Sequence, residues 1–329
     1  MTLLRQAAAL MMNELIRMLM IIFLTGGAVL SYNAHGYDKT EDFYTQYPCS
    51  CDKDDSHPGY CKKISALLKK TGLHTKLQQI KDIYTDCCSK LKQSNGNTNY
   101  SKEIKGDIYR SCPEIYKKNQ KDLSTTFAQT LEKILNVIHI HDPNLPYLQG
   151  FSFIIAALMR HSTASITFGV FCYLINNKNI LPITACLCKN EDPNGIDNTY
   201  QKNIICILKK KDPQIFKYLN KYNYLKEYFI HSIGSTFVCF HLNYITGDKN
   251  QINVIHHFID KGVWFLYCLV VSEILFTHSS IENYYTEKGS LTSILTFYIN
   301  KEEDWERIIA QAEEIFTQAK IPHCCCPCY

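Results

Sequence analysis

Apolar residues recur three or four positions apart along most of the chain, which is the spacing of one face of an α-helix. The segment Ile64–Leu91 has this spacing with one interruption, at Gly72. Ser124–Ile140 has it without a break, with Ser124 as the predicted N-cap and Pro143 just beyond the end. The same spacing predicts further helices over Gln149–Met159, Ile166–Ile175, Ile215–Leu219, Tyr228–Tyr244, Ile252–Ile259, Val263–Phe276, Ser290–Tyr298 and Asp304–Ala319.

No part of the chain sustains the two-residue alternation of a β-strand, and no internal repeat is present. The sequence therefore predicts an all-α fold, a helical array of two sub-lobes with an apolar segment at its N-terminus. Val263–Phe276 is apolar on nearly every side, which places it in the centre of the array. The polar loop 189–203 is the predicted boundary between the sub-lobes.

Changes in composition along the chain predict five regions. In order these are an apolar segment (1–31), a polar cysteine-containing linker (32–62), the helical domain (63–300, with sub-lobes at about 63–188 and 204–300), a C-terminal helix (301–320) and a cysteine-rich tail (321–329).

The overall composition is that of an ordinary globular protein. Of 329 residues, 46% are hydrophobic and 20% are charged, which excludes wholesale disorder. The 35 basic and 31 acidic residues leave a net charge of +4, which is too small to indicate a nucleic-acid partner. Glycine is scarce, with 14 residues, which argues against a glycine-rich phosphate loop.

The N-terminal segment is basic and then apolar. Arg5 and Arg17 precede an uncharged run that begins at Met18, and the next charged residue is Asp38. Three interpretations remain open: a cleaved signal peptide, a single membrane anchor, and a helix packed on the domain or an overextended gene start.

Sixteen cysteines are distributed unevenly. No pair of CxxC units is present, so no metal site is expected, and we expect most of the thiols to be reduced. A cluster next to a chain end is typical of S-acylation, although a metal-binding tail and a low-complexity end are alternatives. The clustered residues are Cys324, Cys325, Cys326 and Cys328.

Two short motifs stand out from the helical background. The first is Ile104-x-x-Asp107-x-x-Arg110, followed by Pro113. On a helix, residues three apart are neighbours, so a carboxylate at 107 can orient a guanidinium at 110.

The second motif, Tyr147-x-Gln149-Gly150, follows the helix that the prolines end. Gly150 has no Cβ beside Gln149, so a ligand or another backbone can approach closely there. Each motif alone is weak, because an Asp/Arg pair is usually a surface ion pair and a lone Gln usually faces solvent.

Together, in this order, the motifs resemble the TBC domain of Rab GTPase-activating proteins, over about residues 64–300. The family pattern is I-x-x-D-x-x-R with a following proline, and then Y-x-Q-G. This sequence departs from the pattern in its flanks. His74 replaces a proline, Pro146 a glycine and Phe151 a methionine, and His256 and His257 lie near the usual Trp-Asp.

The resemblance implies that the protein activates a GTP-bound Rab-family GTPase and performs no independent reaction. It assigns Arg110 as an arginine finger and Gln149 as a glutamine finger that orients the attacking water. The partner carries GTP and Mg²⁺, so no cofactor of its own is expected. The supporting residues would be Ile104, Asp107, Tyr147 and Gly150.

The implied setting is vesicle transport at the cytosolic face of endomembranes, with membrane association through the apolar segment or the cysteine-rich tail. One alternative is a TBC-like module that binds a Rab without activating it. Another is a secreted cysteine-rich helical protein, with Cys49, Cys51 and Cys61 oxidised and Asn99 glycosylated.

Overall fold

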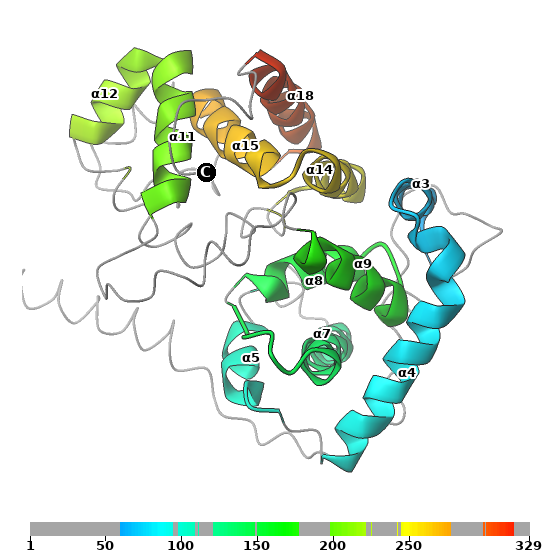
Figure 1. Cartoon of the computed structure of the whole chain (residues 1–329). Helices are drawn as coiled ribbons and strands as arrows, with labels where there is room; N and C mark the ends of the chain where they lie inside the picture. The colour runs from blue at the N-terminus through cyan, green and yellow to red at the C-terminus, as the bar shows by residue number, and fades with distance from the viewer. Residues whose placement is uncertain are drawn as a thin grey trace, which may run out of the picture. The chain divides into compact units, whose positions relative to one another are not determined.

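A computed structural model describes residues 60–94, 98–108, 111, 121–148, 150–177, 198–221, 225, 242, 245–277, 299 and 301–318. The predicted all-α class is confirmed (Figure 1). Within the described ranges the only strand-like pairing is an isolated bridge between Tyr60 and Ser162. The helices are α3 (Lys62–Lys70), η2 (Leu73–Lys76), α4 (Leu77–Gln93), α5 (Ser101–Ile108), α7 (Lys121–His141), α8 (Phe151–Met159), α9 (Ala164–Asn176), α11 (Asn198–Lys211), α12 (Pro213–Lys221), α14 (Asp248–Lys261), α15 (Val263–Phe276) and α18 (Glu302–Gln318).

Most predicted helices are present with shifted ends. The predicted break at Gly72 separates α3 from η2 and α4, and its φ of 73° is one that glycine adopts without strain. Helix α7 begins at Lys121, so the predicted N-cap Ser124 lies inside the helix. The N-terminal apolar segment and the predicted helices Tyr228–Tyr244 and Ser290–Tyr298 lie outside the described residues, apart from Leu242.

The predicted loop 189–203 was wrong at its C-terminal end, because α11 begins at Asn198. Ile204, Ile207 and Leu208 of this helix are buried. No helix was predicted over Asn198–Lys211, because the polar run 189–203 was assigned to a loop and the next predicted helix began at Ile215.

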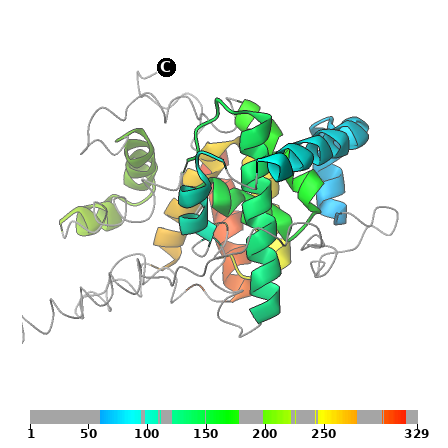
Figure 2. The ribbon, with the colours of Figure 1, turned by 90° about the horizontal axis from the view of Figure 1, so that it is seen from below.

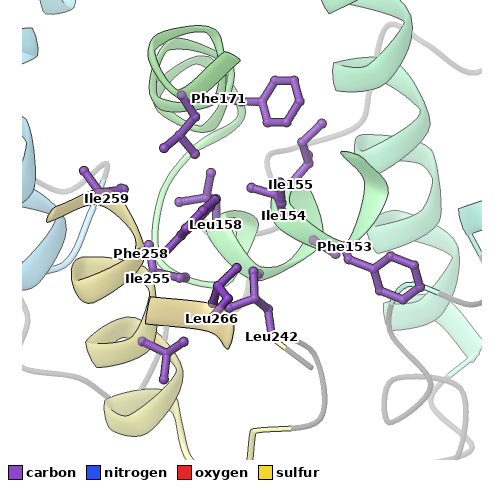
Figure 3. Close-up of a cluster of buried hydrophobic side chains, with 14 of the residues drawn as sticks. Phe153, Ile154, Ile155, Leu158, Phe171, Leu242, Ile255, Phe258, Ile259 and Leu266 are labelled. Carbon is purple, nitrogen blue, oxygen red and sulfur yellow. The ribbon is translucent and has the colours of Figure 1, made fainter. Parts of the chain in front are cut away.

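Helix α8 contacts helices from both halves of the sequence. All nine of its residues are buried, and it packs against α7, α9 and α14. Figure 3 shows Phe153, Ile154, Ile155 and Leu158 of α8 among apolar side chains of the other helices. Each fully buried side chain of this size contributes about 1.5–3 kcal/mol to folding. The neighbouring side chains labelled in the figure are Phe171, Leu242, Ile255, Phe258, Ile259 and Leu266.

A buried polar contact lies at the end of α8. Gln251 of α14 donates through Nε2 to the carbonyl of Leu242 at 2.8 Å, so its Oε1 faces the Nε2 of His161 at 3.1 Å. Because an amide oxygen only accepts, His161 carries its proton on Nε2 in this contact. The carbonyl of His161 in turn accepts from the amide of Cys61 at 3.1 Å, which ties the start of α3 to α8 and α14.

Helix α4 packs along α7 and α9, and helices α15 and α18 pack together further along the chain (Figures 1 and 2). Tyr84 of α4 meets Phe168 of α9 with ring centroids 5.7 Å apart. The Ser272 hydroxyl of α15 donates to the carbonyl of Ile308 in α18 at 2.8 Å.

No disulfide joins the described cysteines. Burial raises the pKa of Cys172 and of Cys268 to about 12, so both are protonated at neutral pH. Cys61, which the secreted alternative takes as oxidised, is buried. Among the helices that the structure describes, none is long and apolar enough to cross a membrane.

The close approach of α4 and α9 gives the first prediction. A Cβ built on Gly169 lies 2.7 Å from Cγ2 of Ile80, whereas one built on Gly106 in α5 meets nothing within 4 Å. Gly169→Ala is expected to lower the free energy of unfolding by about 1–3 kcal/mol through overpacking. Gly106→Ala is expected to raise it by about 0.5–1 kcal/mol through helix propensity. Denaturant unfolding followed by circular dichroism measures both, and equal effects would contradict the predicted overlap.

Candidate functional site

Helix α5 carries the described part of the first motif. Ile104 and Asp107 are 1% and 4% exposed, and Ile108 is also buried, so three of its eight residues face inward. The helix packs on α7 and also contacts α8. A carboxylate buried in this way is costly unless it accepts hydrogen bonds.

A hydrogen bond joins the two motifs. The hydroxyl of Tyr147 donates to Oδ2 of Asp107 at 2.7 Å, across 40 positions of sequence. A hydrogen bond from a hydroxyl to an ionised carboxylate is stronger than a hydrogen bond between two neutral groups. The segment that leads to Arg110 and the segment that leads to Gln149 are thereby fixed to each other at this point.

Aromatic rings surround the Tyr147 side of this bond. Phe151, the first residue of α8, meets the Tyr147 ring edge-on, with centroids 6.2 Å apart and an interplanar angle of 87°. Tyr100 stands before α5 and its ring centroid lies 6.5 Å from that of Tyr147. Together with Ile104 and Pro146, these rings line a small apolar hollow between α5, α7 and α8.

Gly150 occupies the N-cap of α8 in a conformation that favours glycine. Its φ is 121° and its ψ is −27°, which L side chains rarely adopt. Its carbonyl accepts from the amides of Phe153 and Ile154 at 3.1 and 3.3 Å. From the sequence, the expected reason for a glycine here was the close approach of a ligand or another backbone. The positive φ is a second reason.

Arg110, Gln149 and the four tail cysteines Cys324, Cys325, Cys326 and Cys328 lie outside the described residues. The predicted proximity of Asp107 and Arg110 therefore stays a prediction. Just beyond Arg110, Ser111 is buried, and its hydroxyl donates to the carbonyl of Asp107 at 2.9 Å.

Sequence reasoning missed the polar contacts that hold α5 against α7. Asn136 lies in α7 between buried apolar residues, is 0% exposed, and accepts hydrogen bonds from Thr98 and Ser101. The available signal was an amide within the apolar run Ile134–Ile138. Further along α5, Nζ of Lys105 lies 3.8 Å from Oε1 of Glu132 in α7. Burial raises the pKa of Glu132, and Lys105 only partly opposes that effect.

Within the part of the chain that the structure describes, no group of three or more His, Cys, Asp or Glu side chains is placed to hold a metal ion.

Comparison with known families identifies the class of protein. The model of the Rab-GTPase-TBC domain matches residues 65–274, which is more than half of the chain and includes both motifs. The protein belongs to this family, whose members are GTPase activators that act on Rab GTPases. No curated protein matches the chain.

The contact between the motifs is tested by a double-mutant cycle. Tyr147→Phe removes a donor from a buried carboxylate and is expected to lower the free energy of unfolding by about 1–3 kcal/mol. In the Asp107→Asn background the same change is expected to cost less, because the charge-assisted bond is already gone. Chemical denaturation of the four proteins measures the coupling, and strictly additive effects would contradict the contact.

Glu132 gives a prediction of pH dependence. Its folded-state pKa is raised, so it contributes stability below its unfolded pKa, about 4.3, and that contribution is lost as the pH rises through the folded value. Glu132→Gln is therefore expected to increase the free energy of unfolding at pH 7, with the increase disappearing at acid pH. Denaturant unfolding at several pH values measures this. Glu303→Gln, at an exposed position of α18, is the matched control, and a gain that persists unchanged at pH 3.5 would refute the prediction.

Proposed function

We propose that the protein accelerates GTP hydrolysis by a Rab-family GTPase, to which it supplies Arg110 and Gln149 in trans. The observation that carries the proposal is the hydrogen bond from Tyr147 to Asp107. It holds the approaches to both residues together inside the region that matches the family.

The chemistry requires a fixed positive charge. Charge develops on the oxygens of the transferring phosphoryl group, and a GTPase alone neutralises it poorly. A guanidinium suits this task, because it remains charged at every physiological pH and bonds two oxygens at once in a planar fork. Arg110 follows Asp107 by three residues. Because Asp107 is buried and hydrogen-bonded, it would restrict the backbone from which the guanidinium of Arg110 extends.

Gln149 would orient the water that attacks the γ-phosphate. A primary amide serves this purpose because it offers both a donor and an acceptor to one water molecule. Its neighbour Gly150 caps a helix whose residues are all buried, so the backbone just after Gln149 is attached to the core. The protein would need no cofactor of its own, since GTP and Mg²⁺ arrive with the partner.

The proposed place of action is the cytosolic face of an endomembrane, in vesicle transport, because that is where Rab GTPases and GTP meet. The apolar segment 1–31 and the cysteine-rich tail 321–329 are the proposed means of membrane association. Both lie outside the described residues.

Single-turnover hydrolysis by a panel of GTP-loaded Rab proteins tests the proposal. The full chain is expected to accelerate at least one of them, and Arg110→Ala and Arg110→Lys to lose most of an acceleration of roughly 10³–10⁵-fold. Gln149→Ala is expected to lose much of it as well. Arg307→Ala, on an exposed position of α18, is the matched control and should leave the rate unchanged.

Binding of the same Rab proteins is measured alongside hydrolysis. Retained binding with no acceleration by the wild-type chain would sink the proposal and leave a binding module. If the Arg110→Ala variant still accelerates hydrolysis, Arg110 is not the arginine finger.

A further inference from the structure

The N-terminal end of α5 is closed by a small network of hydrogen bonds. The amide of Thr98 donates to Oγ of Ser101 at 2.8 Å, and the amide of Ser101 donates back to the carbonyl of Thr98 at 3.2 Å. Both hydroxyls also point to Asn136 of α7. Thr98 Oγ1 lies 2.6 Å and Ser101 Oγ lies 3.1 Å from its Oδ1.

The orientation of the Asn136 amide follows from its other contact. Its Nδ2 lies 2.9 Å from the carbonyl of Glu132, which can only accept, so this atom is the donor. The oxygen therefore faces Thr98 and Ser101 and accepts from both. With 0% exposure, Asn136 has no access to water that would replace these partners.

Helix α5 is too short to hold its own position. An isolated helix of eight residues is unstable in water, so its placement depends on contacts with its neighbours. Apolar contacts of Ile104 and Ile108 press it onto the core, but such contacts are not directional. Hydrogen bonds hold it near its two ends, at Asn136 and at the Asp107–Tyr147 bond, and the longer Lys105–Glu132 ion pair lies between them.

We propose that Asn136 is a positioning residue for the GTPase-activating reaction. It fixes the start of α5 and thereby the direction in which the helix delivers the segment that contains Arg110. This inference rests on the proposed function, and it adds a residue outside both motifs to the machinery that orients the arginine finger.

Asn250 of α14 provides a matched control. It is also buried, at 2% exposure, and it also donates through Nδ2 to the carbonyl four residues before it, Thr246, at 3.2 Å. A second bond, at 2.9 Å, reaches the carbonyl of Glu302 on another element, as Asn136 reaches the loop before α5. The two asparagines share burial and the bond to the carbonyl four residues earlier, but Asn136 accepts through Oδ1 from the segment it anchors, whereas Asn250 donates through Nδ2.

The first measurement is amide hydrogen exchange of the full chain, which needs no GTPase. Asn136→Ala is expected to increase exchange across α5 by about tenfold, which corresponds to the loss of one net hydrogen bond. Asn250→Ala is expected to increase amide exchange in α14 and at the start of α18, and to leave α5 unchanged. Unchanged exchange in α5 would overturn the anchoring role.

The second measurement is single-turnover hydrolysis with a responsive Rab protein. Asn136→Ala is expected to reduce the maximal rate of hydrolysis by roughly 10–100-fold with little change in affinity for the Rab protein. Displacing a catalytic group by about 1 Å has an effect of this size. Asn250→Ala should leave the rate unchanged even if it destabilises the fold equally. Thr98→Val removes the 2.6 Å bond from the other side without altering α7, and it is expected to reproduce part of the loss.

The outcomes separate the two proposals. If the wild-type chain accelerates hydrolysis and loss of Asn136 loosens α5 without changing the rate, the positioning role is wrong and the proposed function stands. If the wild-type chain accelerates no Rab protein, both proposals fail, whatever the exchange of α5 shows.

Discussion

A carboxylate that is withdrawn from water must be given donors, and this requirement organises the candidate site. Asp107 is almost fully buried, and Tyr147 supplies one of the hydrogen bonds that make its burial tolerable. Because the donor lies 40 positions away, satisfying the carboxylate also brings the two motifs together. The aromatic packing of Tyr147 and the cap at Gly150 then extend this point of attachment into α8 and the core.

How much the sequence predicts depends on whether the determining forces are local. Val263–Phe276 was predicted with its correct ends because a helix buried on all sides has no polar face to blur the pattern. Helix α11 was not predicted, because the polar run 189–203 was assigned to a loop. The break at Gly72 was predicted for a local reason, since a positive φ favours glycine whatever surrounds it.

The site shows the same division. The motif residues Ile104, Asp107, Tyr147 and Gly150 were found from their spacing and family resemblance. The bond between Asp107 and Tyr147 and the anchoring by Asn136 were not, because both connect elements that are distant in sequence. A polar residue in an apolar helical run signals that a partner exists, but only the packing of α5 on α7 identifies it.

The attachment of α5 at both ends also concerns the encounter with a partner. A short helix held only by apolar contacts would lose conformational entropy when a second protein bound it, and the affinity would be lower by that amount. Here the hydrogen bonds to Asn136 and Tyr147 restrict α5 during folding, before any partner arrives. In the proposed complex, association then need not order α5 itself, and that part of the interaction energy remains available to stabilise the complex.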